Sequence, residues 1–81
     1  MIIKYYKSII CPRCIPTNRF LKSIREKFPE IVIEEIEVLK NMKAAKKDGI
    51  GSIPSIIIGN RVYRGVPPED EFISLIQSSS N

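Results

Sequence analysis

The 81-residue chain contains no histidine, only two cysteines and no apolar run of the roughly 20 residues that a membrane-spanning helix needs. Structural zinc sites take four ligands, usually cysteine or histidine, so this chain is poorly equipped for one. Residues 1–6 also lack the basic segment, the long apolar segment and the cleavage site of a secretory signal peptide. These absences predict a cytoplasmic protein with no membrane segment, no metal and no cofactor.

The length predicts a single domain that spans residues 1–81. Thirteen basic and nine acidic residues give a net charge of +4. Lys43, Lys46 and Lys47 lie close together on a short predicted helix, which we interpret as a solvated face and not as a nucleic-acid interface. The positive charge can nevertheless steer acidic partners toward the protein.

Hydrophobic periodicity predicts alternating strands and helices. Within residues 12–27 the apolar side chains recur at three- and four-residue spacing, which is typical of an amphipathic helix, and Pro16 is expected to loosen or kink its first turn. Glu34 and Glu35 interrupt the alternation of the second strand, which predicts an edge strand or a bulge. The expected strands are residues 2–6, 31–38, 55–58 and 61–64, and the expected helices are residues 12–27, 41–47 and a last helix from residue 69, with residues 78–81 frayed.

This order, β-α-β-α-β-β-α, predicts an α/β fold. The first strand–helix–strand unit implies parallel pairing, and the hairpin around Gly59-Asn60 adds antiparallel pairing. We therefore expect a four-stranded mixed sheet flanked by three helices, with the strand at residues 55–58 buried on both faces.

The two cysteines, Cys11 and Cys14, lie where the first strand gives way to the first helix. Free N–H groups and the helix dipole favour negative charge there, so we expect Cys11 to be shifted toward the reactive thiolate. Cys11 is then the nucleophile and Cys14 the resolving thiol of a dithiol–disulfide reaction. Pro12 suits the first helical turn, and Arg13 either adds positive potential to the site or is an ordinary exposed residue.

Other uses of a Cys-x-x-Cys pair stay open. A structural disulfide that closes so small a ring would contribute only about 2 kcal/mol, and a zinc site would need carboxylates or a second chain. A soft-metal carrier is the main alternative, since two thiolates suit Cu(I). Copper chaperones end on a strand, whereas this chain is predicted to end on a helix. A partner-binding module without catalysis is a further possibility.

Cys11-Pro12-Arg13-Cys14 after a strand, with Gly51-Ser52-Ile53-Pro54-Ser55 some way downstream, resembles the thioredoxin/glutaredoxin superfamily. The resemblance implies a thioredoxin-like fold and a cis Ile53–Pro54 bond that faces the dithiol. Such a bond frees the backbone of Ile53 to pair with an extended substrate segment. The C-P-x-C motif, the chain length and Tyr6 are similar to those of glutaredoxins.

Other positions differ from the glutaredoxin pattern. Ser8 replaces a customary lysine, and Arg13 replaces an aromatic residue between the cysteines. The segment Tyr63-Arg64-Gly65-Val66-Pro67-Pro68-Glu69 is more similar to the end of a thioredoxin, and the chain resembles small thioredoxins of glutaredoxin size. The resemblance implies a monomeric oxidoreductase in electron transport. It reduces protein disulfides, is recycled by an unidentified reductase and does not depend on glutathione.

Overall fold

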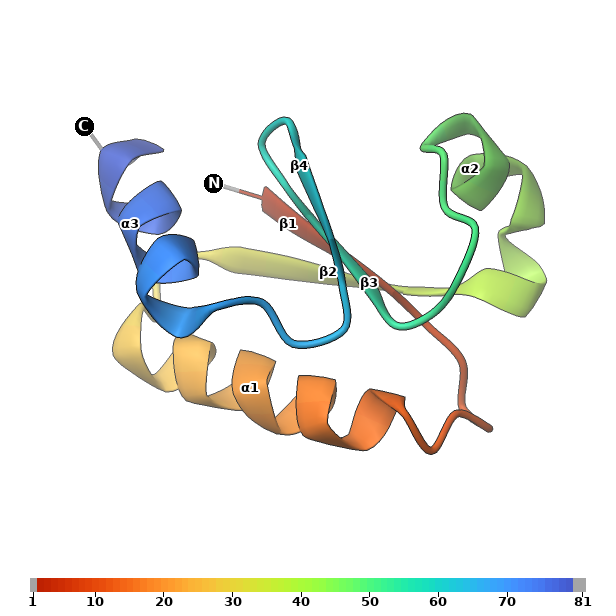
Figure 1. Ribbon diagram of the computed structural model, residues 1–81, viewed down its shortest axis with the longest axis horizontal. Coiled ribbons are helices and arrows are strands. Elements are labelled where there is room, and N and C mark those ends of the chain that lie inside the picture. The colour runs from red at the N-terminus through yellow and green to blue at the C-terminus, as the bar shows by residue number, and fades with distance from the viewer. Residues whose placement is uncertain (1, 80–81) are drawn as a thin grey trace.

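Residues 2–79, which the computed structural model describes, form the predicted α/β fold (Figure 1). The sheet has four strands in the order β2-β1-β3-β4. The strands are β1 (Ile2–Lys7), β2 (Val32–Glu37), β3 (Ser55–Ile58) and β4 (Arg61–Arg64). The helices are α1 (Cys14–Lys27), α2 (Met42–Lys47) and α3 (Glu69–Ser79), with a short 3-10 turn η1 (Val38–Lys40) before α2.

The pairing of the strands confirms the mixed sheet. β1 runs parallel to β2 and antiparallel to β3, and β3 and β4 form an antiparallel hairpin. Gly59 has a φ of +58° at the hairpin tip, a left-handed conformation that favours glycine. β2 lies at an edge, as the glutamate pair predicted, and β1 and β3 form the centre of the sheet.

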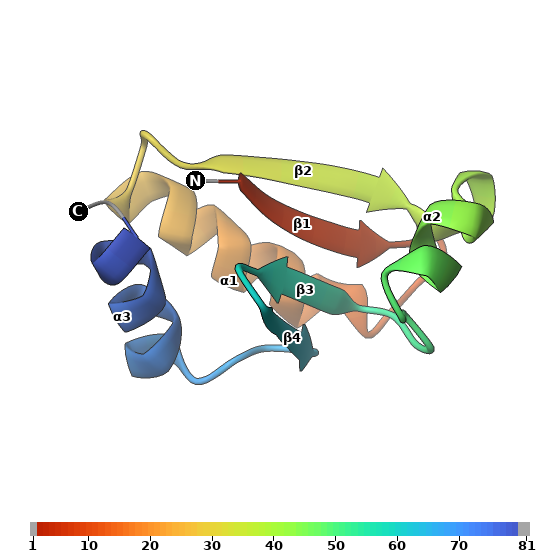
Figure 2. The ribbon, with the colours of Figure 1, turned by 90° about the horizontal axis from the view of Figure 1, so that it is seen from above.

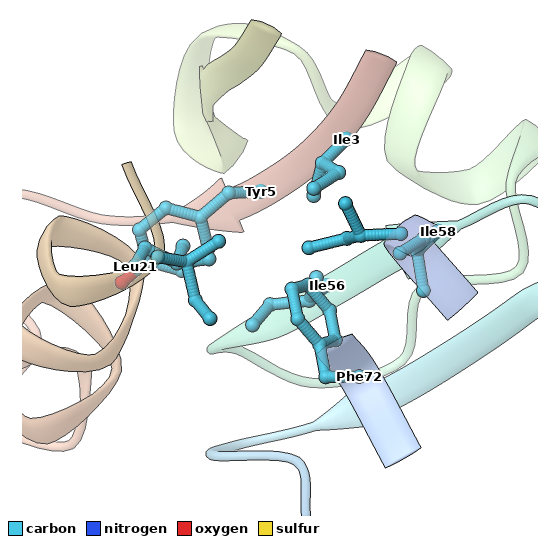
Figure 3. Packing of buried hydrophobic residues seen from close by; sticks show 8 residues of the cluster. Ile3, Tyr5, Leu21, Ile56, Ile58 and Phe72 are labelled. Atoms are coloured by element: carbon cyan, nitrogen blue, oxygen red, sulfur yellow. The ribbon is translucent and has the colours of Figure 1, made fainter. Parts of the chain in front are cut away.

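The core lies between one face of the sheet and helices α1 and α3. Ile3 and Tyr5 point from β1 toward this face, where alternate residues of a strand must point together. Leu21 from α1 and Phe72 from α3 close the core from the other side (Figure 3). The ring of Phe72 also packs edge-on against Phe20, with 5.3 Å between ring centroids.

The opposite face of the sheet is covered only at one end. Seen from above, α2 lies beyond the ends of β1 and β2 (Figure 2). There the Tyr6 hydroxyl donates a hydrogen bond of 2.6 Å to Asp48, which follows α2. Ile57, which pairs with Lys4 on this face, is only half-buried, so the expected burial of β3 on both faces is incomplete.

Helix α1 begins at Cys14 and not at Pro12. The residues before it form a turn, in which the N–H of Cys14 donates to the carbonyl of Cys11 at 3.0 Å. Pro16 is therefore the third residue of α1, where its missing N–H would have no intrahelical partner in any case. The expected loosening of the helix does not follow, and α1 continues to Lys27.

Helix α3 reaches Ser79, the last residue described. The Ser78 hydroxyl donates to the Ser74 carbonyl at 3.1 Å, so this part of the segment predicted to fray is helical. Residues 80–81 lie outside the described residues, and their fraying stays a prediction. None of the helices within residues 2–79 is long and apolar enough to span a membrane.

Candidate active site

The two cysteines lie on the turn that leads from β1 into α1. Besides the hydrogen bond from the N–H of Cys14 to the carbonyl of Cys11, the N–H of Ile15 donates to the carbonyl of Pro12 at 3.2 Å. This turn places Cys11 beside the first residue of the helix. Both thiols are free, Cys11 is half-buried and Cys14 is only 2% exposed. The arrangement therefore presents one thiol to the surroundings and keeps the other beneath it.

The electrostatics of Cys11 differ from the sequence-based expectation. Burial raises the pKa of the Cys11 thiol above its ordinary value, and the hydrogen bond and charge of Cys14 add to this rise. The backbone N–H groups of Cys14 and Arg13 lower the pKa of Cys11, as expected at a helix start, but they are outweighed. The expected shift toward the thiolate was wrong, because desolvation and the second thiol cannot be read from a helix-start pattern.

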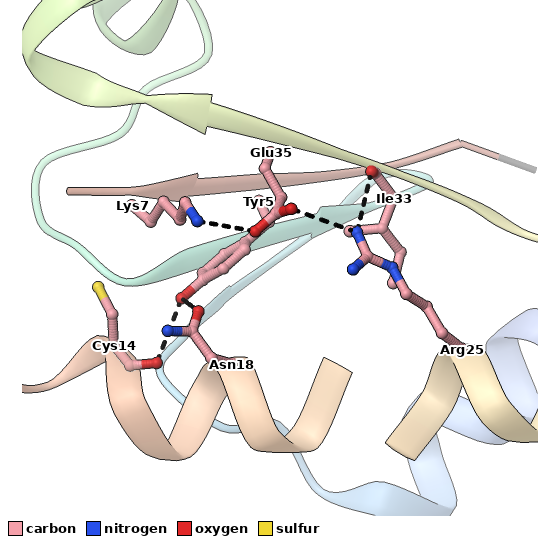
Figure 4. Close-up of polar contacts among 7 residues, drawn as sticks. All are labelled: Tyr5, Lys7, Cys14, Asn18, Arg25, Ile33 and Glu35. Carbon is pink, nitrogen blue, oxygen red and sulfur yellow. Dashed lines mark hydrogen bonds and ion pairs between the residues drawn. The ribbon is translucent and has the colours of Figure 1, made fainter. Parts of the chain in front are cut away.

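Tyr5 and Asn18 surround the buried cysteine, and sequence reasoning missed both of them. The Tyr5 hydroxyl donates a hydrogen bond of 2.7 Å to Asn18 Oδ1, and it lies 3.4 Å from the carbonyl oxygen of Cys14 (Figure 4). Burial, together with a hydrogen bond to the Cys14 side chain, raises the pKa of Tyr5 well above its ordinary value. Tyr5 therefore stays protonated and acts as a donor beside Cys14.

Two local signals could have found this pair. Alternation along β1 places Tyr5 on the same face as Ile3, which is the face that α1 covers. Asn18 stands four residues after Cys14, and side chains at that spacing share one face of a helix.

The second half of the site is the loop that enters β3. The Ile53–Pro54 bond is cis, as the resemblance implied. Pro54 is buried, and its carbonyl accepts a hydrogen bond of 2.9 Å from the N–H of Gly65. Because Tyr6 pairs with Ser55, the start of β3 lies at the same end of the sheet as the turn that carries the dithiol. Sheet pairing thus brings the two halves of the site together.

Two hollows lie at the turn that carries the cysteines: one is lined by Arg13 and the other by Cys11. The first, of about 260 Å³, is a groove that contains three of the sequence-predicted site residues, Arg13, Ile53 and Pro54. Its other lining residues are Pro16, Thr17, Ser52, Arg64, Gly65 and Val66. The second hollow, of about 550 Å³, is lined by Cys11 and Pro12 together with residues 7–10, Ile15 and Asn18. Five of the six predicted site residues therefore line one hollow or the other, and the buried Cys14 lines neither.

The groove also contains polar groups that have no hydrogen-bond partner within residues 2–79. The hydroxyl of Thr17 is buried beside it without a hydrogen-bond partner among residues 2–79. The backbone N–H and carbonyl of Ile53 make no backbone hydrogen bond within the same residues. This free backbone is what an added extended segment would need for pairing.

The described part of the chain holds no cluster of three or more histidine, cysteine or acidic residues that could bind a metal ion. Two free thiols, one in the turn before α1 and one at its first residue, can pass between a dithiol and a disulfide. With its order of strands and helices, the protein is a thiol–disulfide oxidoreductase of thioredoxin-like fold. The amino-acid sequence identifies the family within this class of oxidoreductases, because the family model of the thioredoxin domain matches residues 1–77. The chain belongs to the thioredoxin domain family.

Individual relatives are similar over nearly the whole chain, and the solved structures among them share its fold. A thioredoxin of Methanocaldococcus jannaschii is 29% identical over 77 residues, which cover 93% of this chain and 91% of the relative. The solved structure of thioredoxin 1 from Thermosipho africanus has a TM-score of 0.77 at 24% identity, and the match covers 98% of this chain and 93% of that one. Thioredoxin-2 of the malaria parasite has a TM-score of 0.81 at 19% identity, with 95% of this chain and 81% of that one covered.

Proposed function

We propose that the protein reduces disulfides in other proteins, with Cys11 as the nucleophile and Cys14 as the resolving thiol. The observation that carries this proposal is the difference in exposure between the two thiols. Cys11 opens onto the hollow of about 550 Å³, whereas Cys14 is 2% exposed. A protein disulfide can therefore reach the first sulfur and not the second.

The proposed reaction has two exchange steps. Cys11 loses its proton and attacks one sulfur of the substrate disulfide. A Cys11–substrate bond forms, the substrate disulfide breaks, and the departing sulfur takes up a proton. Cys14 then loses its proton and attacks the sulfur of Cys11. The second substrate sulfur departs and is protonated, and the Cys11–Cys14 disulfide remains. Two electrons have passed from the protein to the substrate.

The remaining site residues are proposed to position this reaction. Ile53 offers its free backbone to an extended segment of the substrate, and Pro54 forms the buried support beneath it. Pro12 borders the Cys11 hollow and Arg13 the neighbouring groove, so both lie where a substrate must pass.

We further propose that a protein reductase, and not glutathione, restores the dithiol. After β4 the chain continues Gly65-Val66-Pro67-Pro68, so it lacks the second glycine of the glutaredoxin pattern and has two prolines before the acidic start of α3. The N–H of Gly65 is also occupied, since it donates to the Pro54 carbonyl. The cytoplasm keeps thiols reduced and is the compartment that we propose for this protein, acting as a monomer.

Insulin reduction by the parent chain, Cys11→Ser and Cys14→Ser tests the assignment. With dithiothreitol as the terminal reductant, we expect activity only in the parent chain. Cys14→Ser that has been reduced and then freed of dithiothreitol should instead accumulate a mixed disulfide with insulin, which non-reducing electrophoresis would reveal. Activity in Cys11→Ser would show that Cys11 is not the nucleophile.

The same assay separates the alternatives. Replacing dithiothreitol by glutathione and glutathione reductase should stop turnover, and undiminished turnover would show dependence on glutathione. Titration of the reduced protein with Cu(I) tests the copper carrier that a Cys-x-x-Cys pair also permits. A tight stoichiometric complex in a protein that fails to reduce insulin would favour the carrier.

A further inference from the structure

We propose that the groove beside the dithiol selects protein disulfides with an acidic side chain next to the reacting cysteine, and that Arg13 and Arg64 recognise this side chain. The inference rests on the proposed function, because it names the substrates of that site. Arg13 stands just before α1 and Arg64 ends β4, far apart in the sequence, yet both line the groove of about 260 Å³. In Figure 1 the turn after β4 and the loop before β3 converge over the first part of α1.

Both arginines are available for a ligand. They are exposed, and neither takes part in an ion pair among residues 2–79. Of the other arginines within residues 2–79, Arg25 pairs with Glu35 and Arg61 with Glu71, while Arg19 lies on an exposed part of α1 outside the groove. Two unpaired guanidinium groups on one groove create a positive potential that attracts carboxylates.

No acidic residue lines the groove or the Cys11 hollow. Every residue that lines the groove or the Cys11 hollow is apolar, polar and uncharged, or basic. Lys7 at the Cys11 hollow is already held by Glu35 at 2.8 Å (Figure 4). Arg13 and Arg64 are therefore the unpaired cations at the two hollows, and they can favour substrates that carry a carboxylate.

The free backbone of Ile53 in the groove explains why an acidic side chain would be recognised next to the substrate cysteine. A substrate segment that pairs with the free backbone of Ile53 is extended, and successive side chains of an extended segment point to opposite sides. With the substrate cysteine at Cys11, its sequence neighbours pass through the groove that Arg13 and Arg64 line. Exposed ion pairs of this kind contribute little individually, so we expect a preference of about two- to fivefold for each arginine.

The test uses peptides whose single cysteine is linked to 2-thiopyridine by a disulfide. Cys11 attacks the peptide sulfur, the peptide–pyridyl disulfide breaks, and the released thiolate is protonated to pyridine-2-thione, whose absorbance reports the rate. Three peptide series place glutamate, alanine or lysine beside the cysteine. Dipyridyl disulfide, which has no peptide, measures the intrinsic reactivity of Cys11. Glutathione linked in the same way distinguishes a small carboxylate ligand from an acidic peptide segment.

We expect the reduced parent chain to react fastest with glutamate peptides and slowest with lysine peptides, after division by the rate with dipyridyl disulfide. Arg13→Glu and Arg64→Glu should each reverse or abolish this order. Arg19→Glu makes the same change of charge on an exposed part of α1 outside the groove and should preserve the order. About 1 M salt should flatten the order in the parent chain, because the screening length falls to about 3 Å.

Equal rates for the three peptide series would overturn the inference, and so would an order that Arg64→Glu leaves intact. A faster rate with the glutathione conjugate than with every glutamate peptide would also overturn it, because the groove would then read a small ligand. Failure of the parent chain to reduce insulin would instead refute the proposed function, so the two failures are distinguishable.

Discussion

Removing the hydroxyl of Tyr6 should destabilise the protein measurably. Tyr6 is fully buried, and its hydroxyl donates a hydrogen bond of 2.6 Å to Asp48. Lys4 lies 3.4 Å from the same carboxylate oxygen. This hydrogen bond ties the end of β1, which leads to Cys11, to the segment after α2, which leads to Pro54. The substitution Tyr6→Phe keeps the ring and removes only the donor.

The expected loss follows from the charge and burial of the partners. Hydrogen bonds to charged groups contribute about 1.5–3 kcal/mol to stability. The Asp48 side chain is still 26% exposed and keeps Lys4 nearby, so we take the lower end, about 1.5 kcal/mol. For a domain of this size each kcal/mol shifts the melting temperature by about 4–8 °C. Tyr6→Phe should therefore melt about 6–12 °C below the parent chain.

The assay is urea unfolding followed by circular dichroism, with Tyr63→Phe as the matched control. The hydroxyl of Tyr63 is buried without a hydrogen-bond partner among residues 2–79. Removing that oxygen should leave the free energy of unfolding unchanged or increase it, because an unsatisfied buried group is costly. Equal losses in Tyr6→Phe and Tyr63→Phe would refute the reasoning, since the loss would then come from packing.

The pH dependence provides a second check. The hydrogen bond from Tyr6 lowers the pKa of Asp48, so its contribution is present above the unfolded pKa of about 3.9 and is lost as the pH falls through the lowered folded value. Burial and Asp48 raise the pKa of Tyr6 to about 12, so that contribution is present below about 10 and is lost as the pH rises through the folded value. Tyr6→Phe should weaken both dependences, and a destabilisation that is constant from acid to neutral pH would contradict this account.

Three further predictions concern the dithiol and the core. Tyr5→Phe removes the hydrogen-bond donor beside Cys14, so the mixed disulfide of Cys11 with a thiol peptide should persist several-fold longer, as measured by quenched mass spectrometry. An unchanged lifetime would show that the Tyr5 hydroxyl has no part in the attack of Cys14 on the mixed disulfide. Because burial raises the pKa of Cys11 above its ordinary value of 9.0, alkylation of the reduced protein by iodoacetamide should still accelerate at that pH, and a rate that levels off near neutrality would contradict it. Phe72→Leu should lower the free energy of unfolding by about 1–2 kcal/mol in urea, less than the 3–5 kcal/mol typical of truncation to alanine, and no loss would mean that the ring is not packed as described.

Local patterns were enough to predict the fold. The alternation of β1, the helical spacing in α1 and the glycine at the hairpin tip depend on neighbouring residues, so one sequence contains them. The start of α1 was placed too early because Pro12 and Arg13 form a turn whose hydrogen bonds run to residues three positions back. Such a turn has the same residue composition as a helix start, and only its pattern of backbone hydrogen bonds distinguishes it from one.

The site was predictable only in part. Cys11, Cys14 and Pro54 belong to motifs, and motifs are visible in sequence. Tyr5 and Arg64 belong to no such motif. They reach the site only through the fold, since β1 brings Tyr5 beneath Cys14 and β4 brings Arg64 to the groove. The direction of the Cys11 pKa was missed for the same reason, since desolvation depends on the whole surroundings of the sulfur.

The antiparallel register between β1 and β3 has a practical consequence for labelling. Tyr6 faces Ser55 at the end of the sheet that carries the chemistry, while Ile3 faces Ile58 at the other end. The tip at Gly59-Asn60 follows Ile58 and so projects from the end remote from both sulfurs. A fluorophore or short affinity peptide grafted at this tip would report on capture of a client without standing in its way.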